Sequence, residues 1–147
     1  MSHGSNRWPS ASACGMIYRF RNALENALKL SAAIPIFRIF SVDKAREFYV
    51  DFLGFRWDWE HRFAEDAPLY AQVSRDEMTL HLSEHFGDAT PGSALFVPVE
   101  GIDELHVELT QKNYRHARPG VETMPWGRVL AVSDPFGNRI SFCERAE

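Results

Sequence analysis

The chain has 147 residues, of which 45% are hydrophobic and 13% aromatic, and it carries a formal net charge of −4 at pH 7. A chain of this length and composition can bury one sizeable core, so we expect one compact globular domain that contains one or two small modules. No apolar run approaches the roughly 18 residues that a membrane-spanning helix needs. The spacing of Cys14 and Cys143 indicates neither a disulfide framework nor a zinc site and fits a cytoplasmic protein.

The first 31 residues differ from the rest of the chain. Residues 1–15 are rich in Ser, Ala, Gly and Asn and are predicted to be disordered, with Met16 as an alternative start. Residues 18–30 fit a short helix but lack the continuous apolar segment of a secretory signal. A packing arm, a disordered tail, a targeting peptide and a membrane-surface helix all remain open interpretations. We assign residues 1–31 to an N-terminal extension and residues 32–147 to the folded domain.

Charge also separates these two parts. The extension has four basic residues and one acidic residue, a charge of +3, so residues 32–147 carry the remaining −7. An acidic domain repels the phosphates of nucleic acid and attracts cationic ligands, so we expect no nucleic-acid partner. An acidic surface that only aids solubility is the commoner explanation of such a balance.

The domain begins with an apolar run, Ile34–Phe40, that contains Pro35, and a proline in a strand belongs at an edge, a strand start or a hinge. Ser41 is then a plausible N-cap for a helix over 42–53, and Gly54 stops that helix. The apolar face of the helix comprises Ala45, Phe48, Tyr49 and Phe52. Three strands follow, over Phe55–Glu60, Leu69–Val73 and Met78–Ser83. The predicted order is β-α-β-β-β.

The same pattern then repeats. We predict a strand over Ala94–Val99, a helix over Ile102–Lys112, a weak strand over Tyr114–Ala117 and a closing hairpin. Residues 88–92, Asp-Ala-Thr-Pro-Gly, have the composition of a linker. The domain therefore divides into modules 32–90 and 91–147.

The closing hairpin turns at Asp134-Pro-Phe-Gly-Asn138, between two runs that alternate in polarity. In its second strand, Ile140 and Phe142 share one face and Ser141 shares the other with Cys143. Trp126 stands just before the first strand, between a stiffening proline and a glycine. It is either a stacking platform or a cap on the hydrophobic face of the sheet.

Trp126-Gly127-Arg128, followed by the Asp-Pro-x-Gly-Asn turn and a last strand, resembles the bleomycin resistance proteins, in the superfamily that also contains glyoxalase I and the extradiol dioxygenases. The similarity extends from about Ala33 to Glu144. The resemblance implies an α+β fold in which two βαβββ modules form a curved mixed sheet around a groove. It also implies a strand-swapped homodimer that crosses to its partner at Pro35. The other matching segments are Ile34–Ile36, Val42–Ala45, Glu47–Tyr49, Leu53–Phe55, Arg75–Leu80 and Gly101–Leu105.

Members of this superfamily with metal chemistry place His, Glu or Gln at four inward strand positions, because a divalent ion needs several converging N or O ligands. The corresponding positions in this chain are Ile34 or its neighbour, His81, Ser93 or Ala94, and Ser141. Only His81 can bind a metal, so we expect no metal, no other cofactor and no catalytic residue. His81 is then a polar group of the groove wall or a buried histidine with a backbone partner. Nucleophile-elbow, phosphate-loop and dinucleotide-binding patterns are also absent from the sequence.

Aromatic residues dominate the second predicted strand, where Trp57-Asp58-Trp59 is expected to point both indoles one way and Asp58 the other. The resemblance places several aromatic residues in the groove and puts His81 where an aromatic is usual. Ser83 and the acids Asp58, Glu60 and Glu65 are weaker candidates for polar contacts. The predicted ligand-binding residues are Trp59, Tyr70, His81, Ser83, Phe96 and Trp126.

The resemblance implies a non-enzymatic, homodimeric protein that sequesters bleomycin-type glycopeptide antibiotics or a similar planar cationic ligand, without a membrane partner. A metal-dependent lyase or dioxygenase with atypical ligands is the alternative. A small-molecule sensor, or a domain without resistance activity, is a third possibility.

Overall fold

The computed structural model describes residues 27–147, and residues 34–147 form one compact unit that is separate from the residues before it. The predictions for residues 1–26, which include the disordered start, Cys14, Met16 and most of the helix over 18–30, lie outside the described residues. Ala27 is helical, but Leu28 and Leu30 are exposed and not helical, so the predicted helix does not reach residue 30. None of the helices within residues 27–147 has both the length and the apolar character needed to cross a membrane.

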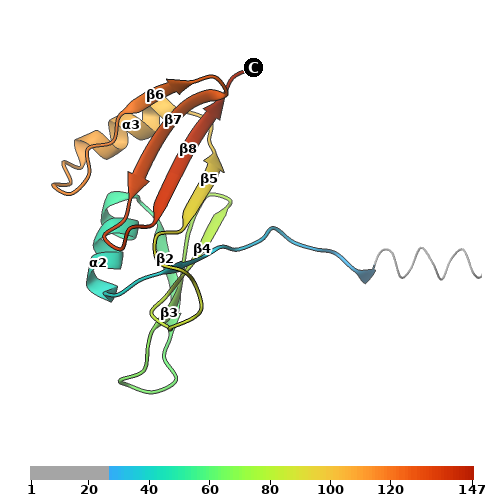
Figure 1. Cartoon of the computed structure of the whole chain (residues 1–147), viewed down its shortest axis with the longest axis vertical. Coiled ribbons are helices and arrows are strands. Elements are labelled where there is room, and N and C mark those ends of the chain that lie inside the picture. Colours follow the sequence, from blue (N-terminus) through green and yellow to red (C-terminus); the bar gives the residue numbers. More distant parts are fainter. Residues whose placement is uncertain (1–26) are drawn as a thin grey trace, which may run out of the picture. The chain divides into compact units, whose positions relative to one another are not determined.

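The first module has the predicted β-α-β-β-β order. Strand β1 (Ile36–Arg38) is followed by helix α2 (Val42–Arg46), which continues into the π-helical turn η1 (Glu47–Phe52). Strands β2 (Arg56–His61), β3 (Tyr70–Arg75) and β4 (Met78–Ser83) complete the module. They form a four-stranded sheet in the order β1-β4-β3-β2, in which β1 runs parallel to β4 and the other pairs are antiparallel (Figure 1).

The helix of this module begins and ends as its sequence predicts. The Ser41 hydroxyl accepts a hydrogen bond from the Lys44 amide at 3.3 Å, which satisfies one of the free N–H groups of the first turn. Gly54 takes the left-handed conformation, φ +72°, just after the last turn. The apolar face packs into the core, with Ala45, Phe48, Tyr49 and Phe52 all buried.

The second module repeats this plan with β5 (Ala94–Pro98), α3 (Ile102–Gln111), β6 (Val121–Met124), β7 (Gly127–Ser133) and β8 (Arg139–Arg145). Its sheet has the order β5-β8-β7-β6, again with one parallel edge strand. Helix α3 lies along the sheet beside β6 and β7 (Figure 1). The Glu144 carboxylate from β8 accepts hydrogen bonds from the Gly101 and Ile102 amides and so caps the start of α3.

One predicted strand of this module is wrong. Residues 114–117 form turns, and the strand that pairs with β7 is Val121–Met124. Asn113 takes a positive φ of 49°, which breaks any extended run there, and Tyr114 instead stacks on Phe52 of the first module with ring centroids 4.7 Å apart. The pattern predicts a strand here because Tyr114 packs against the core, although it does so from a loop.

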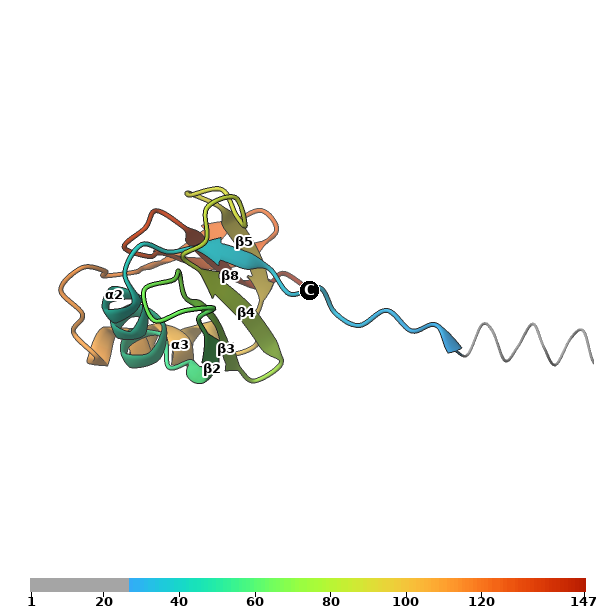
Figure 2. The ribbon, with the colours of Figure 1, turned by 90° about the horizontal axis from the view of Figure 1, so that it is seen from below.

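The two modules share one hydrophobic core and are joined by a buried polar clamp. The Tyr49 hydroxyl donates to the Asp134 carboxylate at 2.6 Å, and the Asn138 side-chain amide donates both to Asp134 and to the Arg38 carbonyl, each at 2.8 Å. Asp134 also accepts from the backbone N–H groups of residues 136 and 138. The Asp-Pro-x-Gly-Asn turn therefore fastens the β7–β8 hairpin to η1 and β1 of the other module. Figure 2 shows the ribbon of both modules from below.

The α+β fold of two βαβββ modules, each with a four-stranded mixed sheet, is therefore confirmed. In this single chain β1 pairs with β4 of its own module. Strand exchange with a second subunit stays a prediction.

Candidate ligand-binding faces

Each sheet has one face against the helices and the core and one face turned away from them, which we call its open face. In the first sheet a β-bulge decides which tryptophan lies there. Trp57 pairs with the buried Val73, whereas Trp59 pairs with Gln72 on the opposite face, because the register shifts by one residue at Asp58. The prediction that both indoles point the same way is wrong, since alternation holds only in a regular strand. Trp57 packs on the core side, and Trp59 is 43% exposed on the open face.

Three of the predicted ligand-binding residues meet on this open face. The Trp59 and Tyr70 rings are nearly parallel, 13° apart, with centroids separated by 6.1 Å. The His81 ring stands edge-on to both, with centroids at 5.4 Å from Trp59 and 5.2 Å from Tyr70. Strands β2, β3 and β4 each contribute one ring, so the sheet register holds this aromatic cluster together.

A chain of hydrogen bonds links two rings of the aromatic cluster to polar side chains of the same face. The Tyr70 hydroxyl lies 2.8 Å from His81 Nδ1, and His81 Nε2 lies 3.0 Å from Gln72 Oε1. Gln72 Nε2 in turn donates to Asp58 Oδ2 at 3.0 Å, and Arg56 donates to the other oxygen of that carboxylate at 2.6 Å. Burial lowers the pKa of His81 and raises the pKa of Tyr70, so both rings are neutral near pH 7.

Ser83 lies beside this cluster in sequence but is fully buried. Its hydroxyl donates to the Asp88 carboxylate at 2.7 Å and accepts from the His85 amide at 3.0 Å. Both contacts lie in the loop after β4. The side chain therefore fixes the start of that loop.

The second sheet carries the other two predicted residues, Phe96 on its open face and Trp126 in the turn before β7. Phe96 is 52% exposed on β5, opposite Ser141 of β8, which in turn pairs with Ala131 of β7. Trp126 is 56% exposed in the turn before β7, where its carbonyl accepts from the Ala146 amide. Four residues of β8 separate these two positions, so the second sheet offers separate aromatic surfaces rather than a cluster.

The mount of Trp126 explains the Trp-Gly-Arg motif. Gly127 has φ +150°, and a Cβ atom there would lie 2.4 Å from the Glu144 carbonyl oxygen, so only glycine fits beneath β8. The Arg128 guanidinium makes a two-pronged contact with the Asp103 carboxylate at 2.6 and 2.7 Å, which ties β7 to the start of α3. Glycine and arginine thus hold the turn, and the indole is left exposed.

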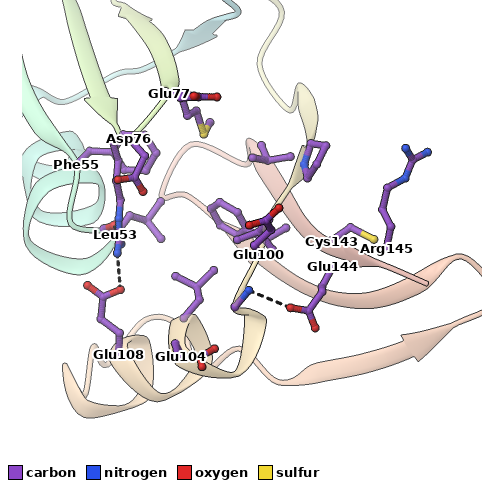
Figure 3. Close-up of a pocket in the computed structure, with 18 of the residues that line it drawn as sticks. Leu53, Phe55, Asp76, Glu77, Glu100, Glu104, Glu108, Cys143, Glu144 and Arg145 are labelled. Atoms are coloured by element: carbon purple, nitrogen blue, oxygen red, sulfur yellow. Dashed lines mark hydrogen bonds and ion pairs between the residues drawn. The ribbon is translucent and has the colours of Figure 1, made fainter. Parts of the chain in front are cut away.

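A cleft within residues 34–147 lies elsewhere and contains none of the six predicted residues. It has a volume of about 1400 Å³ and is bounded by the β3–β4 turn, the end of β5, α3 and the end of β8 (Figure 3). Its rim is acidic, with Asp76, Glu77, Glu100 and Glu104 around it, and Glu108 is neutralised by Arg75 at 2.8 Å. Its size alone does not make it the ligand site, because none of the exposed aromatic rings within residues 27–147 lines it.

The residues of the open faces do not fit a metal centre. His81 is the one candidate ligand at the superfamily's metal positions, and both of its ring nitrogens are already engaged, by Tyr70 and by Gln72. Among the residues that the structure describes, no three His, Cys, Asp or Glu side chains converge closely enough to hold an ion.

Gln72 and the bulge at Asp58 are the parts of this face that the sequence analysis missed or misplaced. Gln72 follows Tyr70 by two residues, so strand periodicity puts both on one face and could have indicated Gln72. Asp58 was expected on the opposite side from Trp59. Because of the bulge, Asp58 lies on the same side as Trp59. The local sequence contains no signal that predicts this bulge.

A fold of paired βαβββ modules with aromatic open faces defines a class of α+β proteins, and comparison with known proteins places this chain within it. A family model described as "Glyoxalase superfamily protein" matches residues 22–147. The chain belongs to the glyoxalase superfamily. No curated protein matches the sequence.

Solved structures of similar proteins include antibiotic-binding members. A bleomycin-binding protein from Streptomyces verticillus, solved with copper(II)-bleomycin, is 32% identical, with a TM-score of 0.59 over 81% of this chain and 99% of its own. TnmS3, an antibiotic-binding protein from Streptomyces sp. CB03234, is 23% identical, with a TM-score of 0.61 over 81% of this chain and all of its own. A glyoxalase/bleomycin resistance/dioxygenase domain from Frankia sp. EAN1pec has a TM-score of 0.64 at 21% identity, over 81% of this chain and 95% of its own. The two more distant structures support the fold.

Proposed function

We propose that this protein binds and sequesters a planar cationic small molecule of the bleomycin type and performs no chemistry on it. The observation that carries the proposal is the aromatic cluster of Trp59, Tyr70 and His81, which is partly exposed on an open sheet face. Flat ligand rings gain from stacking on such surfaces, by about 0.5–1.5 kcal/mol beyond the area that they bury. The 32% identity to a bleomycin-binding protein supports the same ligand class.

The acidic charge of the domain favours a cationic ligand. Residues 32–147 carry a formal charge of −7, which raises the local concentration of cations and speeds their association. Added salt should therefore slow association, while the stacking energy, which is short-range, should change little.

We further propose that the binding groove forms in a homodimer, between the open face of the first sheet of one subunit and that of the second sheet of the other. A ligand ring would then lie between Tyr70 of one subunit and Trp126 of the other, with Trp59, His81 and Phe96 along the walls. Exchange of the segment before β1, hinged at Pro35, is the proposed route to this dimer. Light scattering at micromolar concentration should give twice the monomer mass, and a monomer alone would reject the dimer.

The proposal excludes the metal-dependent lyase or dioxygenase. A metal at His81 would have to break a hydrogen bond to Tyr70 or to Gln72, and no second ligand stands at the other superfamily positions. Elemental analysis of the purified protein should find no stoichiometric Zn, Ni, Fe or Mn. About one ion per subunit that is lost in His81→Ala would overturn the proposal in favour of an enzyme.

Titration calorimetry and tryptophan quenching with bleomycin or phleomycin test the sequestration directly. Trp126→Ala should weaken binding at least about tenfold, which corresponds to about 1.4 kcal/mol, because the exposed indole loses its whole contact with the ligand. Val107→Ala removes an exposed apolar side chain from α3 and should leave binding unchanged.

Two failures have different meanings. The titrations should extend to about a millimolar of either antibiotic, because a Kd of about 1 mM corresponds to a binding free energy of only about −4 kcal/mol. If the wild-type protein gives neither heat nor quenching up to that concentration, sequestration of that ligand class is wrong. If it binds but Trp126→Ala and Tyr70→Ala bind equally well, the ligand class is right and the groove lies elsewhere.

A further inference from the structure

The hydrogen bonds that link Asp58, Gln72, His81 and Tyr70 can be assigned donors and acceptors one after another, beginning with Asp58. Hydrogen bonds from Gln72 and from Arg56 lower the pKa of Asp58 to about 2, so this carboxylate is ionised near neutral pH. An ionised carboxylate can only accept hydrogen bonds. Asp58 therefore dictates which end of the neighbouring amide it meets.

Gln72 has one orientation that satisfies this requirement. Its Nε2 group lies 3.0 Å from Asp58 Oδ2 and donates to it. The flipped amide would place two acceptors face to face, which costs free energy and leaves a donor unused. The carbonyl oxygen Oε1 is consequently the atom that faces His81, at 3.0 Å.

The Gln72 carbonyl then sets the tautomer of His81. Because Oε1 can only accept, the His81 Nε2 atom must carry the proton. A neutral imidazole has one ring proton, so Nδ1 is left with a lone pair. Nδ1 lies 2.8 Å from the Tyr70 hydroxyl, and it accepts that hydroxyl's proton in a hydrogen bond.

The last step concerns Tyr70. A phenol has one O–H donor, and here His81 uses it, so only the oxygen lone pairs remain for any further partner. Tyr70 also lies next to the exposed Trp59 ring in a nearly parallel arrangement. A flat ligand stacked on this face would therefore meet a hydrogen-bond acceptor beside an aromatic surface.

We propose that Asp58, Gln72 and His81 act as positioning residues that make the Tyr70 oxygen an acceptor, so that this face selects planar cations bearing N–H donors. The inference rests on the proposed function, because it names the ligand chemistry of the same face. Trp59 supplies contact area, and Tyr70 supplies the choice among ligands. An analogue whose exocyclic amines are fully alkylated stacks as well but cannot donate to Tyr70 from those amines.

Two dyes separate these contributions. Proflavine and acridine orange are planar tricyclic cations that share one ring N–H donor, but the amino groups of proflavine add N–H donors at the edge of the ring system and the dimethylamino groups of acridine orange add none. Fluorescence titration gives the ratio of their affinities for each variant. Tyr70→Phe should reduce the relative preference for proflavine about fivefold, the factor that a hydrogen bond of about 1 kcal/mol corresponds to. Tyr114→Phe, which removes a hydroxyl outside this face, should leave the ratio unchanged.

Asp58→Asn combined with Gln72→Glu tests the direction of these hydrogen bonds and leaves the net charge unchanged. The amide at residue 58 donates to the carboxylate at residue 72, which accepts from His81 Nε2 and stabilises the imidazolium form, whose Nδ1–H donates to the Tyr70 oxygen and occupies one of its lone pairs. The preference for proflavine should fall by a similar factor, although Tyr70 is intact. Glu104→Gln combined with Gln111→Glu exchanges the same two groups on α3 and is the control.

Imidazole nitrogen shifts in a ¹⁵N NMR spectrum of the ligand-free protein give a readout that needs no binding. The spectrum should show His81 as the Nε2–H tautomer at neutral pH, and the Nδ1–H tautomer would overturn the inference. If the dye ratio is unchanged both in Tyr70→Phe and in the Asp58→Asn, Gln72→Glu double variant, or if bleomycin binds and proflavine does not, the inference is wrong while sequestration still stands. Failure of bleomycin and both dyes to bind would instead reject the proposed function.

Discussion

The two sheets have the same strand order and the same helix placement, yet their open faces differ in chemistry. On the first sheet, aromatic rings and polar groups of three strands are linked by hydrogen bonds, from Asp58 to Tyr70. On the second sheet, the row through Phe96 continues into Ser141 and Ala131, and Trp126 stands apart in a turn. Strand topology thus fixes which positions face outward, and the side chains at those positions decide what each face can recognise.

This difference suggests a division of labour in any groove that uses one face of each kind. The first sheet has fixed acceptors and can discriminate between ligands by their donors. The second sheet has flat or small side chains and can contribute contact area with little selectivity. Substitutions on the two sheets should therefore change different observables, selectivity for the first and affinity for the second.

The largest effect is expected for Gly127→Ala, which alters the first residue of β7, next to Trp126, on the second sheet. The new Cβ atom would lie 2.4 Å from the Glu144 carbonyl oxygen and 2.9 Å from the Arg145 Cα, both backbone atoms. Relief requires β7 and β8 to separate, so urea unfolding should show a loss of about 2–4 kcal/mol. Gly120→Ala is the control, because a Cβ there meets no atom within 4 Å, and it should change stability by less than about 0.5 kcal/mol. Equal stability of the two variants would show that β8 can move away from residue 127 without a loss of stability.

Tyr49→Phe should have the next largest effect, because it opens the clamp between the modules. In the wild type the Tyr49 hydroxyl donates to the buried Asp134 carboxylate at 2.6 Å, and the substitution removes this donor. A hydrogen bond to a charged group contributes about 1.5–3 kcal/mol, so the free energy of unfolding should fall by about 2 kcal/mol. Tyr114→Phe is the matched control. A loss equal to that of the control would mean that Asn138 and the turn amides alone satisfy Asp134.

The same tyrosine predicts how stability depends on alkaline pH. Burial, together with the Asp134 charge and hydrogen bond, raises the pKa of Tyr49 well above its ordinary value of 10.0. The unfolded chain then loses this proton at a lower pH than the folded chain, so the contribution is complete below about pH 10 and is lost as pH rises further. Urea unfolding between pH 8 and 11 should show this decline in the wild type and a shallower one in Tyr49→Phe. Parallel curves would contradict the assignment.

Much of the fold follows from the sequence because its signals are local. The cap at Ser41, the stop at Gly54 and the period of Ala45, Phe48 and Phe52 define the first helix without reference to the rest of the chain. Alternation in Ile140–Cys143 likewise assigns the faces of the last strand correctly. The strand near Tyr114 was wrong because the signal for burial there came from a tertiary contact, the stack on Phe52, which a local pattern cannot distinguish from a strand.

The candidate site is less accessible to sequence reasoning. The resemblance selected Trp59, Tyr70 and His81, which do meet, but it did not indicate Gln72, which links His81 to Asp58. Hydrogen-bond direction depends on atoms a few ångströms apart on three strands, and the β-bulge that brings Asp58 into line depends on strand pairing. Neither is encoded in a spacing along the chain.

Phe96→Ala sharpens the comparison of the two faces through ligand binding. Phe96 is half exposed on the second sheet and contributes a flat apolar surface, so its removal should weaken both proflavine and acridine orange by about threefold to tenfold, equivalent to about 0.5–1.5 kcal/mol. The ratio of the two affinities should not change. Tyr70→Phe, which changes the ratio, is the paired variant from the first sheet. If Phe96→Ala alters the ratio instead, the second sheet also discriminates and the division between faces is wrong.

The smallest effect is expected for Arg128→Lys, in the same motif as Gly127 but on its exposed side. Hydrogen bonds from the Arg128 guanidinium lower the pKa of Asp103, so the pair contributes to stability above the ordinary aspartate pKa and loses that contribution as pH falls below it. A lysine keeps the charge but not the two-pronged geometry. Because both side chains are largely in solvent, the loss in urea unfolding should be well below that of Tyr49→Phe, and added salt should reduce the difference from wild type.

Arg145→Lys is the control for Arg128→Lys, since Arg145 is an exposed arginine of the neighbouring strand that makes no ion pair within residues 27–147. A loss at Arg128 that persists in high salt would show that the arginine acts through packing of its aliphatic chain rather than through charge. A loss as large as that of Gly127→Ala would show more, namely that the contact with Asp103, and not the fit of glycine beneath β8, holds the turn that carries Trp126.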